Sequence, residues 1–406
     1  MLIRYGTDGK GKLVKKAVVY TKSEHLISNH KIDPDALQIV TRLRDYGYTA
    51  YIVGGAVRDL IVGNVPKDFD IVTDATPSKI KRIFRNSRII GKRFRLVHVV
   101  FGIKIFEVST FRSNKEGSVG NEFGSIEEDV HRRDFTLNAL YYDPIQEQVI
   151  DYVGGMRDIK KHILRPVISL DRIFVDDPVR MLRAIKYSAT THAKMSYSLR
   201  RKIRTSAILL SQVSPSRLTE EMLKILNNSC VYEIIQEALD TDLFMYLQPT
   251  ATSMIYENRT FEKNFMANIK KLGELNTTEP DARLGKKLVF VIEDFIKSLT
   301  NWKKETRSKA SYSELYGKTW AECRNFVLPM NPQKKELEFA VKFVLNSLGV
   351  KKSPSVSRPK YEKWTITDAK SQQDPKKTNS NKKKSNKKTT KVPQGNPNTK
   401  VVANDQ

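Results

Sequence analysis

Residues 66–80 have the sequence PKDFDIVTDATPSKI, in which two aspartates one residue apart adjoin a run of apolar side chains. Because side chains alternate between the two faces of a strand, Asp68 and Asp70 would share one face, with their carboxylates about 5 to 7 Å apart. Like charges at that distance repel each other unless a cation lies between them. Asp is also common in turns, so a polar turn ahead of a strand is an equally good interpretation of the pair.

The composition of the chain limits the class of protein. Its 406 residues are enough for more than one domain. The 71 Lys and Arg against 45 Asp and Glu give a formal net charge of +26, which indicates a polyanionic partner, either nucleic acid or an anionic membrane surface. No apolar run approaches the roughly 18 residues of a membrane-spanning helix, and the N-terminus has no signal-peptide core. Cys230 and Cys323 lie far apart with no CxxC pair, so we expect a cytoplasmic protein without membrane association.

The order of sequence patterns predicts an α+β fold in four segments. Residues 1–32 are an N-terminal extension, residues 33–170 a head domain with a small mixed sheet, and residues 171–350 a helical neck and body. Lys, Asn, Ser, Thr and Pro predominate in residues 351–406. Such a segment cannot bury enough apolar surface to offset the entropy of ordering, so we expect a disordered basic tail. A solvated tail with no partner and a tail that contacts a polyanion both remain open.

Local patterns predict the elements around the aspartate pair. We expect helices at residues 35–48, 56–63 and 77–86, strands at 49–55 and 68–75, and a hairpin over 96–112 that turns at Gly102. Beyond the head, helices are expected at 177–189, 214–228 and 232–247. The second of these begins with Ser214 as N-cap and Pro215 at the first helical position.

A strand that runs into Gly54 and Gly55 and then into a helix is the second candidate feature. Glycines there let the backbone approach a ligand closely, and the free amides of the first helical turn favour phosphate oxygens. Arg58 adds a cation one turn into the helix. A plain tight turn would also explain the two glycines, but their position shortly before the aspartate pair favours a phosphate site.

The third feature is Glu107 in the predicted strand IKIFEVSTFR. It shares a face with Ile103 and Ile105, so we expect it in a position that should be buried and apolar. With Asp68 and Asp70 it would complete three carboxylates, which are the ligands that Mg²⁺ prefers. Two bound Mg²⁺ ions could activate an attacking hydroxyl and stabilise a pyrophosphate leaving group. A surface glutamate paired with a lysine is the alternative.

These residues resemble a known family. GGAVRDLIVGNVPKDFDIVTDATP is similar to the GG and DxD signature of the nucleotidyltransferase superfamily, in the branch that holds bacterial poly(A) polymerases and class II CCA-adding tRNA nucleotidyltransferases. EVSTFR, SIEEDVHRRDFTLNALYYD, VIDYVGGMRDI and DDPVRMLRAIKYSA resemble later motifs of that branch in order and spacing. The segment RNSRIIGKRFRLVHVVFG is more similar to the bacterial poly(A) polymerase group. The resemblance spans roughly residues 33–230.

The resemblance implies a role for each candidate residue. Asp68 and Asp70 would bind Mg²⁺, with Glu107 as the third catalytic carboxylate. Gly54, Gly55, Arg58 and Arg112 would hold the triphosphate. Arg133, Asp134 and Asn138 would secure sugar and phosphates and link the head to the neck. Asp177 and Arg180 would read the incoming base, and their i, i+3 spacing on a helix predicts that they face the same side. A local ion pair is the alternative for these two.

Two departures from the family pattern bear on selectivity. Asp176 stands where the family usually has Glu, which shortens the reach of that acid. The stretch between Arg112 and SIEED is shorter than in some bacterial poly(A) polymerases.

The family implies an enzyme that adds AMP from ATP to RNA 3′ ends with Mg²⁺ and without a template. CCA addition to tRNA is the nearest alternative, with the same catalytic residues. A non-catalytic RNA-binding protein on the same fold is a third possibility, against which the three retained carboxylates argue.

Overall fold

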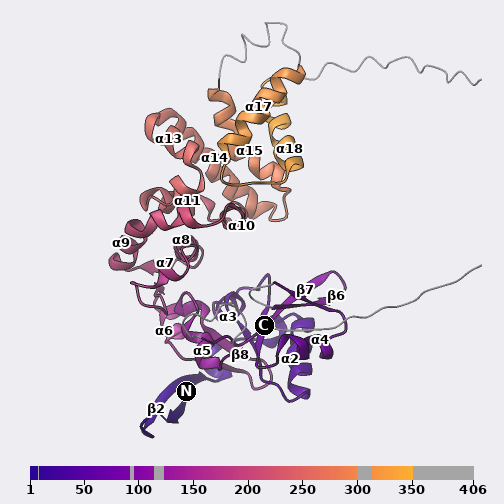
Figure 1. Ribbon diagram of the computed structural model, residues 1–406, viewed down its shortest axis with the longest axis vertical. Helices are drawn as coiled ribbons and strands as arrows, with labels where there is room; N and C mark the ends of the chain where they lie inside the picture. The colour runs from indigo at the N-terminus through magenta and orange to yellow at the C-terminus, as the bar shows by residue number, and fades with distance from the viewer. Residues whose placement is uncertain (8, 92–95, 114–122, 300–311, 351–406) are drawn as a thin grey trace, which may run out of the picture. The chain divides into compact units, whose positions relative to one another are not determined.

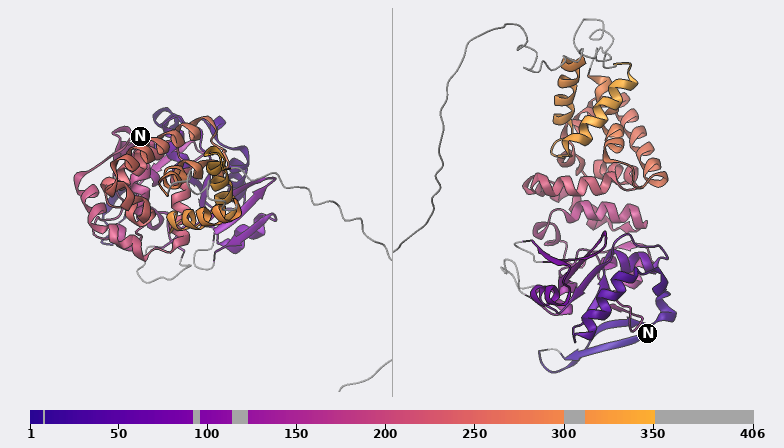
Figure 2. Two further views of the ribbon diagram at one scale, coloured as in Figure 1. Left: turned by 90° about the horizontal axis from the view of Figure 1, so that it is seen from above. Right: turned by 90° about the vertical axis from the view of Figure 1, so that its right-hand side faces the viewer.

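The computed structural model describes residues 1–7, 9–91, 96–113, 123–299 and 312–350. Strands predominate in the N-terminal part of the chain and helices in the rest, as the colours from indigo to yellow show in Figure 1 and Figure 2. This arrangement confirms the predicted α+β fold class. Residues 351–406, for which a tail is predicted, lie outside the described residues, as do residues 92–95 and 114–122.

The head is built on a mixed nine-stranded sheet with the strand order β1-β2-β9-β8-β3-β4-β7-β6-β5. Its strands are β1 (Leu2–Thr7), β2 (Leu13–Tyr20), β3 (Ala50–Val53), β4 (Asp70–Thr73), β5 (Ser87–Ile90), β6 (Leu96–Phe101), β7 (Lys104–Thr110), β8 (Leu140–Asp143) and β9 (Gln148–Asp151). Among the described strand pairs of this sheet, β4 and β7 alone are parallel. The sheet is larger than predicted, because β1, β2, β8 and β9 extend one side of it. Residues 1–20, expected as part of an extension, therefore contribute two of its strands.

Helices cover the two faces of the sheet unequally. The short helical elements of the head are α1 (Lys22–His25), η1 (Asn29–Lys31), α2 (Pro34–Asp45), α3 (Gly55–Ile61), α4 (Pro77–Ile83), α5 (Ile126–His131), η2 (Thr136–Asn138) and α6 (Gly155–Lys160). Ile39 of α2 and Ile80 of α4 pack with Ile71 on one face of the sheet. On the other face Val72 shares a smaller core with Val130 of α5. The second face is thus covered at one end only.

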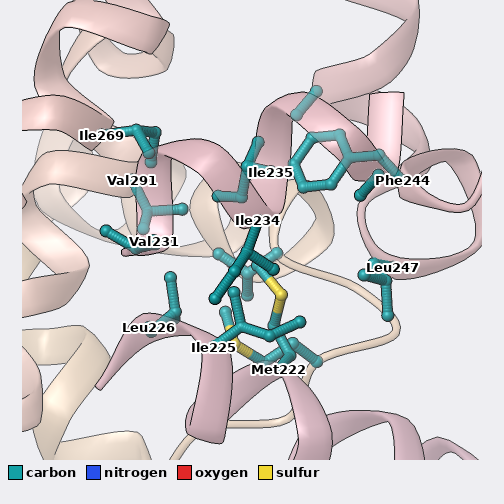
Figure 3. Close-up of a cluster of buried hydrophobic side chains, with 14 of the residues drawn as sticks. Met222, Ile225, Leu226, Val231, Ile234, Ile235, Phe244, Leu247, Ile269 and Val291 are labelled. Carbon is teal, nitrogen blue, oxygen red and sulfur yellow. The ribbon is translucent and has the colours of Figure 1, made fainter. Parts of the chain in front are cut away.

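The helical part of the chain has its own apolar core. It contains β10 (Ile163–Leu164), α7 (Ile173–Asp176), α8 (Arg180–Thr191), β11 (Lys194–Met195), α9 (Tyr197–Ser206), η3 (Ala207–Gln212), α10 (Pro215–Leu226), α11 (Val231–Asp240), α12 (Phe244–Leu247), α13 (Pro249–Glu257), α14 (Arg259–Thr278), α15 (Leu284–Ser298), α17 (Tyr312–Phe326) and α18 (Lys334–Ser347). Figure 3 shows Met222 of α10 beside Ile234 of α11 in this core. Ser214 and Pro215 begin α10, as the sequence predicts.

A buried carboxylate fixes the turn that leads from the sheet to α6. Asp151, at the end of β9, is 2% exposed. One of its oxygens accepts hydrogen bonds from the amides of Val153, Gly154 and Gly155 at 2.7 to 3.0 Å, and the other from Met156 at 3.0 Å. The whole turn therefore depends on one side chain.

We predict that Asp151→Ala lowers the free energy of unfolding by about 3 to 5 kcal/mol, because four amides, those of Gly155 and Met156 buried, lose their acceptor. Urea unfolding followed by circular dichroism measures the change. The control is Asp240→Ala, which breaks an exposed ion pair with Arg200 and should cost no more than about 1 kcal/mol. A loss for Asp151→Ala as small as that of the control would contradict the structural role.

Candidate active site

All twelve site residues expected from the sequence line one cavity of about 1,910 Å³. Small-ligand sites usually have volumes of about 300 to 1,000 Å³, so this cavity has room for more than one substrate. Its wall continues from the head onto α8, α10 and the turn that leads into α11. The residues expected from the sequence are Gly54, Gly55, Arg58, Asp68, Asp70, Glu107, Arg112, Arg133, Asp134, Asn138, Asp177 and Arg180.

The aspartate pair lies where the strand begins. Asp70 is the first residue of β4 and pairs with Val53, the last residue of β3. Because the chain turns away after Val53, the ladder stops there and Asp68 precedes the strand. The prediction that both aspartates lie on the strand is therefore wrong for Asp68, although both side chains line the cavity.

Glu107 lies on the neighbouring strand β7. Val108 pairs in register with Ile71, which sets Glu107 beside Asp70 on the same face of the sheet. That face is open: Ile103 is 100% exposed and Ile105 is 59% exposed. The expectation that Glu107 occupies a buried position is therefore wrong, because Phe106 and Val108 form the buried face of β7.

Within the described residues, the basic side chain that contacts Glu107 is a histidine. His98 Nε2 of β6 lies 3.6 Å from Glu107 Oε1. The alternative prediction, a surface glutamate paired with a lysine, is correct in that the carboxylate is exposed. It is wrong about the partner, which is His98. Glu107 can therefore reach a ligand in the cavity without leaving a buried position.

Asp70 is the carboxylate most strongly affected by its surroundings. Burial by the protein around it, and then the negative charge of Glu107, raise the pKa of Asp70 from 3.8 to about 6. Asp68 acts in the same direction, and Arg133 opposes it. Within the described residues, neither Asp68 nor Asp70 has a side-chain hydrogen bond or an ion pair. A bound cation would relieve this repulsion.

The donor set fits Mg²⁺. No group of three or more His, Cys, Asp or Glu side chains within the described residues has the geometry of a complete metal site. Mg²⁺ does not need one, since proteins usually bind it through one or two carboxylates together with substrate phosphates. Asp68 and Asp70 supply oxygen ligands of that kind, and Glu107 lies beside them.

The predicted glycine turn lies between β3 and α3, on the wall of the cavity. Gly54 has a φ of +72°, a conformation that side-chain-bearing residues rarely adopt. A Cβ atom at this position would lie 3.8 Å from Asp70 Oδ2 and 3.9 Å from Arg133 Nη1, so the turn lies between the carboxylate and the guanidinium. Gly55 begins α3, and Arg58 follows one turn later.

Seven arginines line the same cavity: Arg58, Arg112, Arg132, Arg133, Arg180, Arg183 and Arg217. Burial and then the nearby charge of Arg112 lower the pKa of Arg132 to about 10. Burial also lowers the pKa values of Arg112 and Arg180. Mutually repelling guanidinium groups that have lost water favour an anion such as a polyphosphate.

A carboxylate and a tyrosine hold Arg133 in place. Its side chain donates to Asp129 at 3.0 Å and to the Tyr141 hydroxyl at 2.9 Å. Tyr141 in turn donates to Asp129 at 2.7 Å. Sequence reasoning missed Arg132, although it adjoins Arg133 in the motif RRD.

A chain of polar contacts runs from α3 to the neck. Arg58 Nη1 donates to Asn138 Oδ1 at 2.7 Å, and the Asn138 amide donates to Asp134 at 3.4 Å. Arg183 of α8 lies 3.9 Å from Asp134 and 3.7 Å from Glu221 of α10. The helix after the glycine turn is thereby connected with the neck.

Asp177 and Arg180 are close but do not lie on one helix. Asp177 has the extended conformation φ −154°, ψ 100° at the end of α7, and Arg180 begins α8. The prediction of a shared helix is wrong because Asp177 precedes Pro178, and the residue before proline disfavours helical geometry. Instead, Arg217 of α10 donates to both oxygens of Asp177 at 3.0 and 3.2 Å.

Family models match two segments of the chain. Residues 50–165 match the poly A polymerase head domain, and residues 194–255 match the model described as a probable RNA and SrmB-binding site of polymerase A. Poly(A) polymerase I of Salmonella typhi is 43% identical over 256 residues, 59% of this chain and 55% of that protein. The CCA-adding enzyme of Geobacillus kaustophilus is 35% identical over 54% of this chain and 55% of that protein. The chain thus spans about half the length of the curated relatives it matches.

Solved structures share the fold over a longer part of the chain. A Bacillus stearothermophilus CCA-adding enzyme in complex with CTP has a TM-score of 0.52 at 26% identity and covers 79% of this chain and 85% of its own. A Thermotoga maritima CCA-adding enzyme complexed with tRNA_CCA has a TM-score of 0.53 at 20% identity, over 81% and 85% of the two chains.

Over its matched segments, the chain is similar to bacterial poly(A) polymerase I and, at lower identity, to CCA-adding enzymes. The resemblance expected from the sequence motifs is confirmed.

We predict that replacing Asp70 by Asn stabilises the metal-free protein in a pH-dependent way. The native carboxyl has a pKa near 6 and the unfolded one near 3.8, so the native state holds an extra proton between these values. Wild-type stability therefore falls as the pH rises through this range and then levels off. Above about pH 6.5 the variant should be more stable by about 1 kcal/mol, a value reduced because Asp70 is open to the cavity.

Urea unfolding in a chelator at several pH values between about 4 and 7.5 measures this difference. The exposed Asp45→Asn variant is the control and should show no trend of this kind. A constant difference between Asp70→Asn and wild type across the range would contradict the raised pKa.

Proposed function

We propose that this chain adds AMP from ATP to RNA 3′ ends without a template and releases pyrophosphate. The single observation that supports this most directly is that Asp68, Asp70 and Glu107 line the same cavity as seven arginines, with room for more than one substrate. The 3′ hydroxyl would attack the α-phosphorus of ATP in line. A new P–O bond forms as the bond between the α-phosphorus and the bridging oxygen breaks.

The carboxylates would hold the metal. Asp68 and Asp70 would bind Mg²⁺, with Glu107 as the third catalytic carboxylate. Bound Mg²⁺ would lower the pKa of the attacking hydroxyl and neutralise charge on the leaving pyrophosphate. Both aspartates would have to be deprotonated to act as ligands, so protonation of Asp70 would oppose metal binding.

The glycine turn and the arginines would hold the triphosphate. Gly54 and Gly55 let phosphate oxygens approach the backbone, and Arg58 is the cation one turn into α3. Arg112 and Arg133, with the adjacent Arg132, would neutralise the phosphates and keep the α-phosphorus in place.

Base selection is assigned to the junction of α7 and α8. Asp177 would accept and Arg180 would donate hydrogen bonds at the edge of the incoming base. Arg217 holds the Asp177 carboxylate, which limits the positions that this acceptor can take. Asp134 and Asn138 would secure the sugar and connect the head with the neck.

The proposal extends to the organisation of the chain. Residues 33–170 would form the catalytic head, and residues 1–32 an extension whose strands β1 and β2 join its sheet. Residues 171–350 would form a neck and body that bind RNA through part of their surface. Residues 351–406 would be a basic tail that adds sequence-independent contacts to phosphates. An enzyme that consumes ATP and transcripts would work in the cytoplasm. No helix within the described residues is long and apolar enough to span a bilayer.

CCA addition to tRNA is the second candidate function. Two observations favour it: the 35% identity to a CCA-adding enzyme and the similarity in fold to one solved with CTP. The higher identity to poly(A) polymerase I and the strong positive charge favour poly(A) addition. A non-catalytic RNA-binding role would require that the retained carboxylates serve no reaction.

The two enzyme functions differ in nucleotide choice and in when addition stops. Purified protein is offered ATP, CTP or both, with an unstructured RNA primer and with a tRNA that lacks its terminal CCA. We predict long A tracts on the unstructured primer and little use of CTP. Asp70→Ala, which removes a metal ligand, is the control for contaminating activity and should lower incorporation by more than about a hundredfold.

The other outcomes are equally clear. Addition of C, C and A to the tRNA followed by a stop, with no extension of the unstructured primer, would establish the tRNA-repair function instead. RNA binding without any incorporation would favour the non-catalytic alternative.

A further inference from the structure

A second cationic surface lies outside the cavity. It consists of Lys160, Lys161, Lys194, Tyr197 and Arg201, and we call it the outer basic patch. All five residues are exposed, and Tyr197 is 81% exposed. None of them lines the cavity that contains the carboxylates.

A short parallel pair of strands brings these residues together from distant parts of the sequence. Ile163 of β10 pairs with Lys194 of β11, and the Lys194 amide donates to the His162 carbonyl at 2.7 Å. Leu164 is buried on the inner side of this pair, so Lys194 is on the outer side, near the end of α6 at Lys160 and Lys161.

Helix α9 continues the patch from its first residue. Tyr197 begins the helix, and Arg201 follows one turn later on the same face. Leu199 and Ile203 form the buried side of α9, which leaves the side with Tyr197 and Arg201 open to solvent.

The cations of the patch differ from their neighbours in having no acidic partner. On the same helix, Arg200 pairs with Glu237 at 2.6 Å and Arg204 with Asp242 at 2.8 Å. Within the described part of the chain, Lys160, Lys161, Lys194 and Arg201 make neither an ion pair nor a side-chain hydrogen bond. Like charges gathered without neutralisation favour a polyanion.

The exposed tyrosine indicates which polyanion. Single-stranded nucleic acid is bound by cations that contact the backbone and by aromatic rings on which bases stack. Tyr197 offers an aromatic ring between Lys194 and Arg201 in the sequence, and three residues of the patch lie in the segment that matches the RNA-binding-site model.

We propose that the outer basic patch binds single-stranded RNA upstream of the 3′ end that enters the cavity. This inference rests on the proposed function for the identity of the polyanion. It adds a second RNA contact, outside the cavity lined by the carboxylates, that acts on long substrates and not on the reaction itself. Short primers that cannot extend beyond the cavity should be insensitive to the patch.

The test compares variants of the full chain that remove charge in matched positions. The patch variant is Lys160→Ala/Lys161→Ala/Lys194→Ala. Its control, Lys263→Ala/Lys270→Ala/Lys271→Ala, also removes one single and two adjacent exposed lysines, here from α14. The stacking role is tested with Tyr197→Ala against Tyr197→Phe. Thermal unfolding first verifies that each variant is folded.

Binding of a single-stranded RNA of about 30 nucleotides is measured by fluorescence anisotropy without ATP or divalent ions, at several salt concentrations. The patch variant should bind about tenfold more weakly near 0.1 M salt. Its slope of log affinity against log salt should be shallower by about 2, near 0.7 for each lost phosphate contact. Tyr197→Ala should lose about fivefold or more, while Tyr197→Phe and the α14 control stay within about twofold of wild type.

AMP addition to a primer of about five nucleotides, too short to span more than one contact region, should be the same in all variants. Equal affinities and salt slopes for wild type and patch variant would overturn the proposal, and the patch would then have another partner, such as an acidic protein. An equal loss in the α14 control would also overturn it, because net charge alone would then explain the effect. If wild type binds RNA through the patch but adds no AMP, the proposed function fails and the RNA site stands.

Discussion

The mutual repulsion of Asp68, Asp70 and Glu107 is the constraint on which the candidate site depends. Burial, and then the charge of Glu107, raise the pKa of Asp70 to about 6, and Arg133 offsets this only in part. The cavity carries the opposite problem in its seven arginines, because burial and then the charges of Arg112, Arg133 and Arg180 lower the pKa of Arg132. The ligand that we propose, a metal-bound polyphosphate, would solve both problems, because it would bring a cation to the carboxylates and an anion to the arginines. The unfavourable electrostatics of the empty cavity are therefore consistent with tight binding of the metal and the polyphosphate together.

Such a site needs a fold that tolerates uncompensated charge. Strand β3 is buried along its whole length and aligns β4, so the position of Asp70 follows from the sheet. Asp151 fixes the turn into α6, and the contacts from Arg58 through Asn138 and Asp134 reach the neck. Because these supports are buried or hydrogen-bonded, the charged side chains can repel one another without displacing the backbone that carries them. Asp177, which we propose helps to select the base, gains a similar support from Arg217, a residue of a helix distant in sequence.

Much of the head follows from local sequence patterns, and the failures have identifiable physical causes. Strand β3, the turn at Gly54 and the hairpin at Gly102 were predictable, because apolar alternation and glycine act over a few residues. The alternation of side chains along β7 also predicted which residues share a face with Glu107. It could not predict which of the two faces of the strand is buried under a helix. The extended conformation of Asp177 could have been predicted from the sequence, because the residue before a proline disfavours helical geometry. Arg132 and Arg217 were missed because their importance arises from contacts between segments far apart in the sequence, and the roles of all twelve predicted site residues remain predictions.

The most direct test of this account is the pKa of Asp70, measured by NMR of the side-chain carboxyl in protein labelled at aspartate, with the resonance assigned from the Asp70→Asn spectrum. The account predicts a pKa of about 6 without divalent ions and a fall toward or below the ordinary 3.8 when Mg²⁺ and a non-hydrolysable ATP analogue are added. Conversely, a pKa near 3.8 that does not change when the metal and the nucleotide analogue are added would mean that Asp70 neither repels its neighbours nor binds a metal, and the central claim would be wrong.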